Sequence, residues 1–287
     1  MKPDKVLSSS DVVSTIHSGD SIVIGGWGPF RKPMALVRAI VASDLTDLTV
    51  MSFAALDLDM LIGAGKVKKA IYPFVALEGA PGALGNYRRA REQGTISVME
   101  ISEYMFVCGF KAAADRLPFY PTRAGLGTDI LVENPEIRLI DSPYTKEKLV
   151  AMPAFEPDVA FIHVNEADSS GNARILGDPY WDYTMLRAAG KVIISCEAVV
   201  STKQLSRDPL SIVIRGHWVT GVVETPCGAH PGSCYPDYGW DGAHLTEYGA
   251  SSAQADSFKH YLDKYVYGKG PADYLKLIGK RLSFKGS

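Results

Sequence analysis

Short apolar runs alternate with helix-like segments along most of this chain, and no other feature of the sequence limits the fold as strongly. Strands are predicted at 21–24, 48–53, 68–75, 96–99, 159–164, 191–196, 212–214 and 219–223. Helices are predicted after Pro33 and at 86–92, 105–117, 184–189, 250–267 and 271–282. Strands that alternate with helices form a mostly parallel sheet covered by helices on both faces. We therefore predict an open α/β fold.

The charge and the apolar runs of the chain argue against two classes of partner. The 287 residues carry a net charge of −2, so no basic field is available to hold nucleic acid. The longest apolar runs fall far short of the ~20 residues that span a bilayer. Residues 1–10 contain no apolar signal-peptide core, so we expect a cytoplasmic protein. Residues 134–152 are loop-like and are interpreted as an excursion within a single domain, 1–287.

A glycine-rich loop follows the first predicted strand, in the sequence Gly25-Gly26-Trp27-Gly28. Glycines let the backbone approach a ligand closely, and the next helix favours an anion at its N-terminus. A dinucleotide fingerprint would need a third glycine where Arg31 stands. We expect this loop to contact a phosphate-bearing or acyl ligand, with a simple tight turn as the alternative. The predicted contacts are Gly26, Trp27, Gly28 and Arg31.

Two carboxylates, Glu100 and Glu103, come directly after the predicted strand 96–99. Carboxylates at the carboxyl end of a parallel strand lie at the edge where such folds bind ligands. Either one could be a general base that takes a proton from water. The alternative is structural, because Ser102 can cap the next helix with Glu103 in its first turn.

A second glycine-containing loop has the sequence Arg123-Ala-Gly125-Leu-Gly127. Its two glycines bracket a turn whose backbone N–H groups can hold an oxyanion or a thioester carbonyl. An ordinary surface loop is the alternative. Arg31 or Arg123 could also bind a substrate carboxylate through a bidentate contact, or be a plain surface charge.

Two histidine-containing segments must be weighed as metal sites. His163 lies five residues before Asp168, but no third ligand has a convincing spacing, so a hydrogen-bonded turn is favoured. Cys227, His230 and Cys234 match no usual zinc spacing. We expect no metal and no cofactor.

Four of these segments, in this order, resemble the landmarks of the alpha subunit of family I CoA transferases. They are residues 25–28, 123–127, 163–172 and 228–231. The resemblance covers most of the chain and implies a sugar-isomerase-like α/β fold. It also implies an acyl-CoA substrate, with CoA as part of that substrate, and a beta subunit of similar fold in an α2β2 assembly.

A narrower resemblance links residues 26–34 and 108–119 to the alpha subunits of bacterial steroid ring-opening CoA hydrolases. It implies hydrolysis of a carbon–carbon bond in a cyclic β-keto acyl-CoA during cholesterol degradation. Glu103 is then the predicted catalytic carboxylate, with Glu100 as second choice. Backbone donors at 26–27 or 125–127 are expected to stabilise the enolate.

The alternative within the family is a transferase that moves CoA between carboxylic acids. Such transferases form a glutamyl-CoA thioester in a Ser-Glu-Asn-Gly-type motif of the beta half. In this chain Pro135 follows Glu133-Asn134, so the nucleophile would have to come from another polypeptide. A third hypothesis is a nonenzymatic small-molecule sensor on the same fold.

Overall fold

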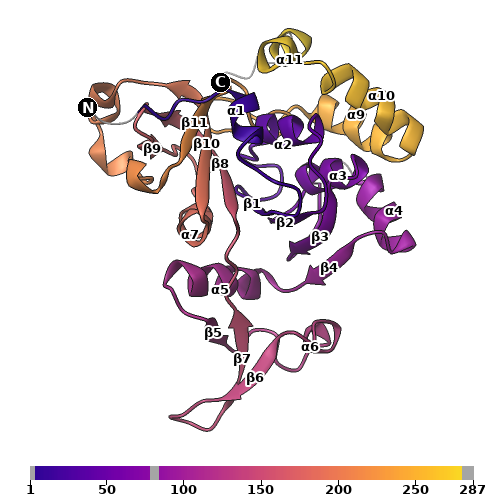
Figure 1. Ribbon diagram of the computed structural model, residues 1–287, viewed down its shortest axis with the longest axis vertical. Coiled ribbons are helices and arrows are strands. Elements are labelled where there is room, and N and C mark those ends of the chain that lie inside the picture. Colours follow the sequence, from indigo (N-terminus) through magenta and orange to yellow (C-terminus); the bar gives the residue numbers. More distant parts are fainter. Residues whose placement is uncertain (1–3, 78–83, 280–287) are drawn as a thin grey trace.

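A central, mostly parallel sheet runs through the computed structural model, which describes residues 4–77 and 84–279 (Figure 1). Its parallel strands are β1 (Ser21–Ile24), β2 (Leu48–Ser52), β3 (Val67–Tyr72), β4 (Ser97–Glu100), β8 (Val159–Ala167), β10 (Lys191–Val199) and β11 (Gly221–Glu224). Their order is β11-β10-β8-β1-β2-β3-β4, and the short β9 (Ala173–Arg174) pairs antiparallel with β8. The predicted α/β class is confirmed.

The strands bury apolar side chains on both faces of the sheet. In β1, Ile22 and Ile24 belong to one hydrophobic cluster and Val23 belongs to the other, because successive strand side chains point to opposite faces. Burial on both faces explains why these strands are continuous apolar runs in the sequence.

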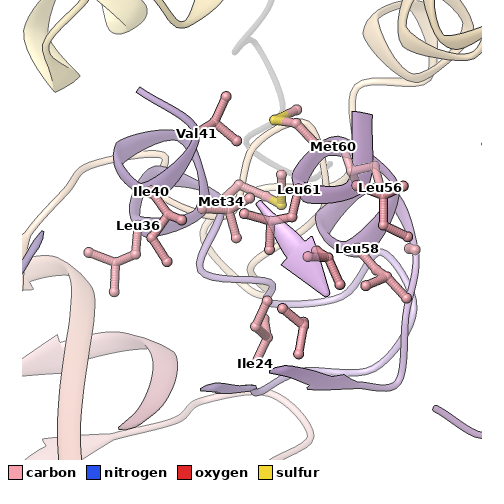
Figure 2. Close-up of a cluster of buried hydrophobic side chains, with 14 of the residues drawn as sticks. Ile24, Met34, Leu36, Ile40, Val41, Leu56, Leu58, Met60 and Leu61 are labelled. Carbon is pink, nitrogen blue, oxygen red and sulfur yellow. The ribbon is translucent and has the colours of Figure 1, made fainter. Parts of the chain in front are cut away.

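Helices cover the two faces of the sheet. The larger cluster includes side chains from α1 (Ser9–Val13), α2 (Met34–Val41), α3 (Leu56–Gly63), α4 (Gly85–Gln93), α9 (Gly242–Ser252), α10 (Ala255–Tyr265) and α11 (Pro271–Ile278). Figure 2 shows Met34 and Ile40 of α2 beside Leu61 of α3, next to Ile24. The opposite face carries α5 (Glu103–Ala114) and α7 (Asp182–Ala188). Helix α3 was not among the predicted elements.

A second, antiparallel sheet lies beyond α5, away from the main sheet (Figure 1). It contains β5 (Phe119–Thr122), β6 (Arg138–Asp141) and β7 (Lys148–Pro153), in the order β5-β7-β6, and α6 (Ile130–Glu133) lies between β5 and β6 in the chain. The prediction that 134–152 is loop was therefore wrong. The side chains of β6 are mostly exposed, and charged residues occupy both of its ends. The sequence therefore has no apolar run that would predict this strand.

The remaining differences fall in the C-terminal third. Residues 212–214 are not a strand; only Ile214 forms an isolated bridge, after the 3-10 turn η1 (Pro209–Ser211). Helix α8 (Thr202–Leu205) and the 3-10 turn η2 (Gly216–Trp218) are also present. The helix predicted at 250–267 is two helices, α9 and α10, interrupted at Ala253 and Gln254. Residues 280–282 of the last predicted helix lie outside the described residues.

Among the described residues, no helix combines the length and the apolar character that a membrane crossing requires.

Candidate functional site

The carboxyl end of β1 is the point from which the sheet grows in both directions. β2 pairs with one side of β1, and β8 pairs with the other after a long excursion of the chain. Ligands of open α/β folds bind outside the carboxyl ends of the strands at such a switch point. The loop 25–28 leaves β1 at this position, so the fold places the predicted glycine loop at the ligand-binding edge.

The glycine loop is a tight turn built from left-handed backbone. Gly26 and Gly28 have φ of +73° and +53°. A Cβ on Gly26 would lie 2.3 Å from the carbonyl oxygen of Phe30, so this position also requires the close approach that only glycine permits. Trp27 and Phe30 exchange backbone hydrogen bonds of 3.1 and 2.9 Å across the turn.

The backbone donors of this turn are already used within the protein. The N–H of Gly26 donates to Asp182 Oδ1 at 2.7 Å, and the N–H of Gly28 donates to the Phe53 carbonyl at 3.1 Å. The N–H of Trp27 donates to Phe30. The prediction that backbone donors at 26–27 stabilise an enolate is therefore wrong in this geometry.

Arg31 is buried, with a relative exposure of 2%. Its guanidinium donates to Asp182 Oδ2 at 2.8 Å, to the His163 carbonyl at 2.9 Å and to the Asp178 carbonyl at 2.7 and 3.1 Å. Arg31 is thus neither a surface charge nor a group available to a substrate carboxylate. It ties the glycine loop to the start of α7 and to β8.

Glu103 is the first residue of α5, and its side chain is exposed. The Ser102 hydroxyl caps the helix by accepting from the Met105 N–H, as the structural alternative predicted. The indole Nε1–H of Trp27 donates to Glu103 Oε1 at 3.0 Å. The fold therefore brings together two of the predicted site residues, which lie 76 positions apart in the chain.

Aromatic rings surround the Trp27 indole. Its ring centroid lies 5.1 Å from that of Phe74, edge to face, and 6.4 Å from those of Phe30 and Tyr180. Phe30 in turn lies 5.7 Å from Trp240. The sequence analysis did not identify Phe30, Phe74, Tyr180 or Trp240 as part of the site, and they come from four separate segments of the chain.

Glu100, the last residue of β4, is directed elsewhere. Its carboxylate lies 3.8 Å from Arg91, and its carbonyl accepts from the Asn134 side chain at 3.0 Å. It lines an open hollow together with Ser102 and Asp129. The structure thus separates Glu100 from the Trp27–Glu103 contact.

The second glycine loop packs against the helix that begins with Glu103. Gly125 has φ of +91°, and a Cβ there would lie 2.7 Å from Met105 Sδ in the first turn of α5. Gly127, with φ of +72°, has open space around its Cα. Arg123 is exposed and pairs with Glu147, its Nη2 donating at 2.7 Å. This loop therefore stays a candidate for contact with the acyl group.

Glu197 is a partly buried carboxylate, with a side-chain exposure of 12%, that the sequence analysis missed. It accepts from His163 Nε2 at 2.7 Å, from the Tyr238 hydroxyl at 2.7 Å and from the Cys227 N–H at 2.6 Å. Burial alone would raise the pKa of Glu197, but these hydrogen bonds outweigh it and the net pKa is lowered. Glu197 lies in the carboxyl-terminal half of β10, so the rule that drew attention to Glu100 could have found it.

The structure divides the residues weighed as metal ligands into separate clusters. Cys234 groups with His163 and Glu197, whereas His230 groups with Asp241 and His244, so the Cys227–His230–Cys234 set does not converge. In both clusters the imidazole nitrogens hydrogen-bond to protein groups: His163 to Ser195 and Glu197, and His230 to Tyr274 and Asp241.

Asp168 is the centre of a turn, as the favoured interpretation of this segment predicted. Its Oδ1 accepts from the N–H groups of Ser170 and Asn172, at 3.0 and 2.9 Å. Its Oδ2 accepts from the Thr202 hydroxyl at 2.9 Å. The carboxylate thus serves the loop between β8 and β9.

Comparison with known proteins places most of the chain in one family. Residues 6–225 match the family model described as coenzyme A transferase. The chain is 44% identical over 288 residues to the "Cholesterol ring-cleaving hydrolase IpdA subunit" of Rhodococcus jostii, covering 97% of each chain. The protein of the same name from Mycobacterium tuberculosis is 41% identical over 281 residues, covering 95% of this chain and 96% of that protein.

Among solved structures, the glutaconate coenzyme A-transferase of Acidaminococcus fermentans superposes with a TM-score of 0.93. That chain is 33% identical in sequence, and the match covers 97% of this chain and 94% of the other.

Proposed function

The chain belongs to the coenzyme A transferase family, and from that premise we propose that it is the alpha subunit of a ring-opening hydrolase. The substrate is a cyclic β-keto acyl-CoA of steroid-ring degradation, and the reaction is a retro-Claisen cleavage by water. The observation that carries this proposal is the similarity to ring-cleaving hydrolase subunits of two bacteria along nearly the whole chain.

The chemistry needs a base, and Glu103 fits that role. Glu103 takes a proton from water, and the resulting hydroxide adds to the ring ketone. The bond between the ketone carbon and the carbon next to the thioester then breaks, and its electron pair moves into the thioester enolate. A proton returns to that carbon, so the product is an open-chain carboxylate that still carries CoA. General base catalysis of this kind contributes typically ~10²–10⁴ in rate.

The enolate needs a donor other than the first glycine loop, whose N–H groups are engaged. We assign this role to the N–H groups of Gly125 and Gly127, because their loop packs on the first turn of α5, the turn that begins with Glu103. The Leu126 N–H between them already donates to the Arg123 carbonyl at 3.2 Å.

Arg31 and Arg123 were the two arginines predicted to bind a substrate carboxylate. Since Arg31 is buried, we assign this role to Arg123.

A partner subunit belongs to the proposal. The relatives are named as subunits, and we infer that this chain works with a beta subunit of similar fold in an α2β2 assembly. The loop 125–127 and Glu103 lie at the surface, where a second chain can complete the site.

The experiment exchanges Glu103 for its neutral isostere in the assembled two-subunit enzyme. Glu103→Gln should lower kcat for ring opening at least about 100-fold while the protein stays folded, because the base is lost but the shape is kept. With the parent enzyme, mass spectrometry should find a product that is heavier than the substrate by one water. In oxygen-18 water, the label should enter the new carboxylate, with CoA still attached.

Glu92→Gln, an exposed change on α4, is the matched control and should turn over normally. Near-normal activity of Glu103→Gln would refute the assignment of the base. If Glu100→Gln loses activity in its place, the second-choice carboxylate is the base.

The second candidate is a coenzyme A transferase, and the 0.93 TM-score to glutaconate coenzyme A-transferase favours it. A transferase would carry CoA on a glutamate of the partner chain. Incubation with acyl-CoA, followed by mass spectrometry of both chains, separates the two. A stable glutamyl-CoA adduct on the partner would overturn the hydrolase proposal.

A further inference from the structure

Glu103 is an exposed side chain at the tip of a helix, yet it has a specific partner. The indole Nε1–H of Trp27 donates to its Oε1 at 3.0 Å, a normal hydrogen-bond length. An unrestrained glutamate would sample many rotamers and would lose that freedom whenever it took up one reactive geometry. A partner that fixes one carboxylate oxygen removes this cost before the substrate arrives.

The Trp27 indole is itself held from several sides. Phe74 packs against it at 5.1 Å with an interplanar angle of 62°. The ring centroids of Trp27, Phe30 and Tyr180 stand 6.4 Å apart in all three pairings, with interplanar angles of 18° to 33°. If the three rings formed one stack, the distance between the two outer centroids would be twice the distance between neighbouring centroids. The three equal distances show instead that the centroids form a triangle, with the rings side by side.

The backbone beneath the indole is anchored in the same way. The Gly26 N–H and the Arg31 guanidinium donate to the two oxygens of the buried Asp182, at 2.7 and 2.8 Å. Trp27 and Phe30 close the turn between them with two backbone hydrogen bonds. The Trp27 indole N–H that donates to Glu103 is therefore carried by a backbone turn that buried hydrogen bonds hold in place.

We propose that Trp27 is a positioning residue for the reaction: its indole N–H fixes Glu103 Oε1 and so directs Oε2 toward the attacking water. This inference rests on the function proposed above and deepens it, because it gives the first glycine loop a task other than binding the acyl thioester. Trp27 acts through Glu103 and not on the reacting atoms.

Two substitutions at Trp27 separate the donor from the ring packing. Trp27→Phe keeps an aromatic ring but loses the N–H. Trp27→His loses the six-membered ring, yet its Nε2 occupies the same position in the five-membered ring as the indole Nε1. Both are measured in the assembled enzyme with 2-oxocyclohexanecarbonyl-CoA or another cyclic β-keto acyl-CoA that the parent enzyme opens.

We expect Trp27→Phe to lower kcat about tenfold or more with KM within about twofold, because a hydrogen bond to a charged group is lost. Trp27→His should retain a higher kcat than Trp27→Phe at a pH where imidazole is neutral. In the background of Glu103→Gln, adding Trp27→Phe should cause little further loss, since residues that act as one unit are not additive.

The matched control is Trp218→Phe, in η2, where the indole packs on Tyr183; its kinetics should match the parent's. A parent-like kcat for Trp27→Phe, a higher kcat for Trp27→Phe than for Trp27→His, or a change in KM alone would overturn the proposal. Full activity of Glu103→Gln would instead refute Glu103 as the base, and a parent enzyme that opens no cyclic β-keto acyl-CoA would overturn the proposed function. The failure of this inference and the failure of the proposed function are therefore distinguishable.

Discussion

Arg31 and Asp182 form an ion pair with side-chain exposures of only 3% and 1%. Arg31 also has φ of +51°, a left-handed conformation that is uncommon for any residue other than glycine. The surrounding hydrogen bonds impose this conformation on the residue. At the scale of one residue, the guanidinium that was predicted to bind a substrate carboxylate instead binds the carboxylate of Asp182.

Removing one partner of this pair leaves an uncompensated buried charge. Arg31→Met should therefore lower the free energy of unfolding by about 3–5 kcal/mol, as measured by chemical denaturation. Arg31→Met combined with Asp182→Leu should recover part of that loss, because the orphaned carboxylate is gone.

Arg123→Met is the matched control, since Arg123 is exposed and its pair with Glu147 lies at the surface. It should leave the denaturation midpoint nearly unchanged. Equal losses for the two arginine variants would contradict the role given to Arg31.

At the scale of an element, the turn after β1 contains two left-handed glycines with different surroundings. Gly28 has open space where a Cβ would stand, whereas a Cβ on Gly26 would meet Phe30 and Arg31 backbone atoms at 2.3–2.9 Å. Gly28 therefore requires only the left-handed conformation. Gly26 requires both that conformation and the absence of a side chain.

Alanine at each position should separate these two requirements. Gly28→Ala should cost about 1–2 kcal/mol of stability, the strain of a left-handed alanine. Gly26→Ala should cost clearly more and should also reduce kcat, because the turn that supports Trp27 must shift. Thermal unfolding and steady-state kinetics check both expectations, and equal effects at the two glycines would be inconsistent with the close approach at Gly26.

At the scale of the whole molecule, Asp59 joins three helices across the larger core. From α3 it accepts from the Asn86 side chain and the Tyr87 N–H of α4, at 2.9 and 2.7 Å. It also accepts from the Tyr248 hydroxyl of α9 at 2.6 Å. Burial is the largest influence on Asp59 and raises its pKa, so each of these donors is needed to support the carboxylate.

Tyr248→Phe should therefore loosen the attachment of α9 to α3. We expect a loss of about 1.5–3 kcal/mol in the free energy of unfolding, the range for a hydrogen bond to a charged group. Tyr267→Phe, a partly exposed tyrosine just beyond α10, is the control. Urea denaturation followed by far-UV circular dichroism measures the stability of both variants. If Tyr248→Phe leaves the free energy of unfolding unchanged, Asp59 does not hold the three helices together.

Much of the main sheet could be predicted from the sequence, because its strands bury both faces and are written as continuous apolar runs. β1, β2 and β10 follow directly from such runs. β6 could not be found in this way, because its residues are mostly exposed and it is stabilised by pairing with β7. An apolar pattern in the sequence indicates that a strand is buried, and an exposed strand such as β6 lacks this pattern.

The same division holds for the site. A helix soon after the strand that ends near Glu100, and a glycine turn after β1, were both predictable, because both depend on neighbours in the chain. The contact of Trp27 with Glu103 and the burial of Arg31 against Asp182 arise only when distant segments fold together. Those contacts join residues 76 and 151 positions apart, and no local propensity encodes which distant side chains meet when strands assemble.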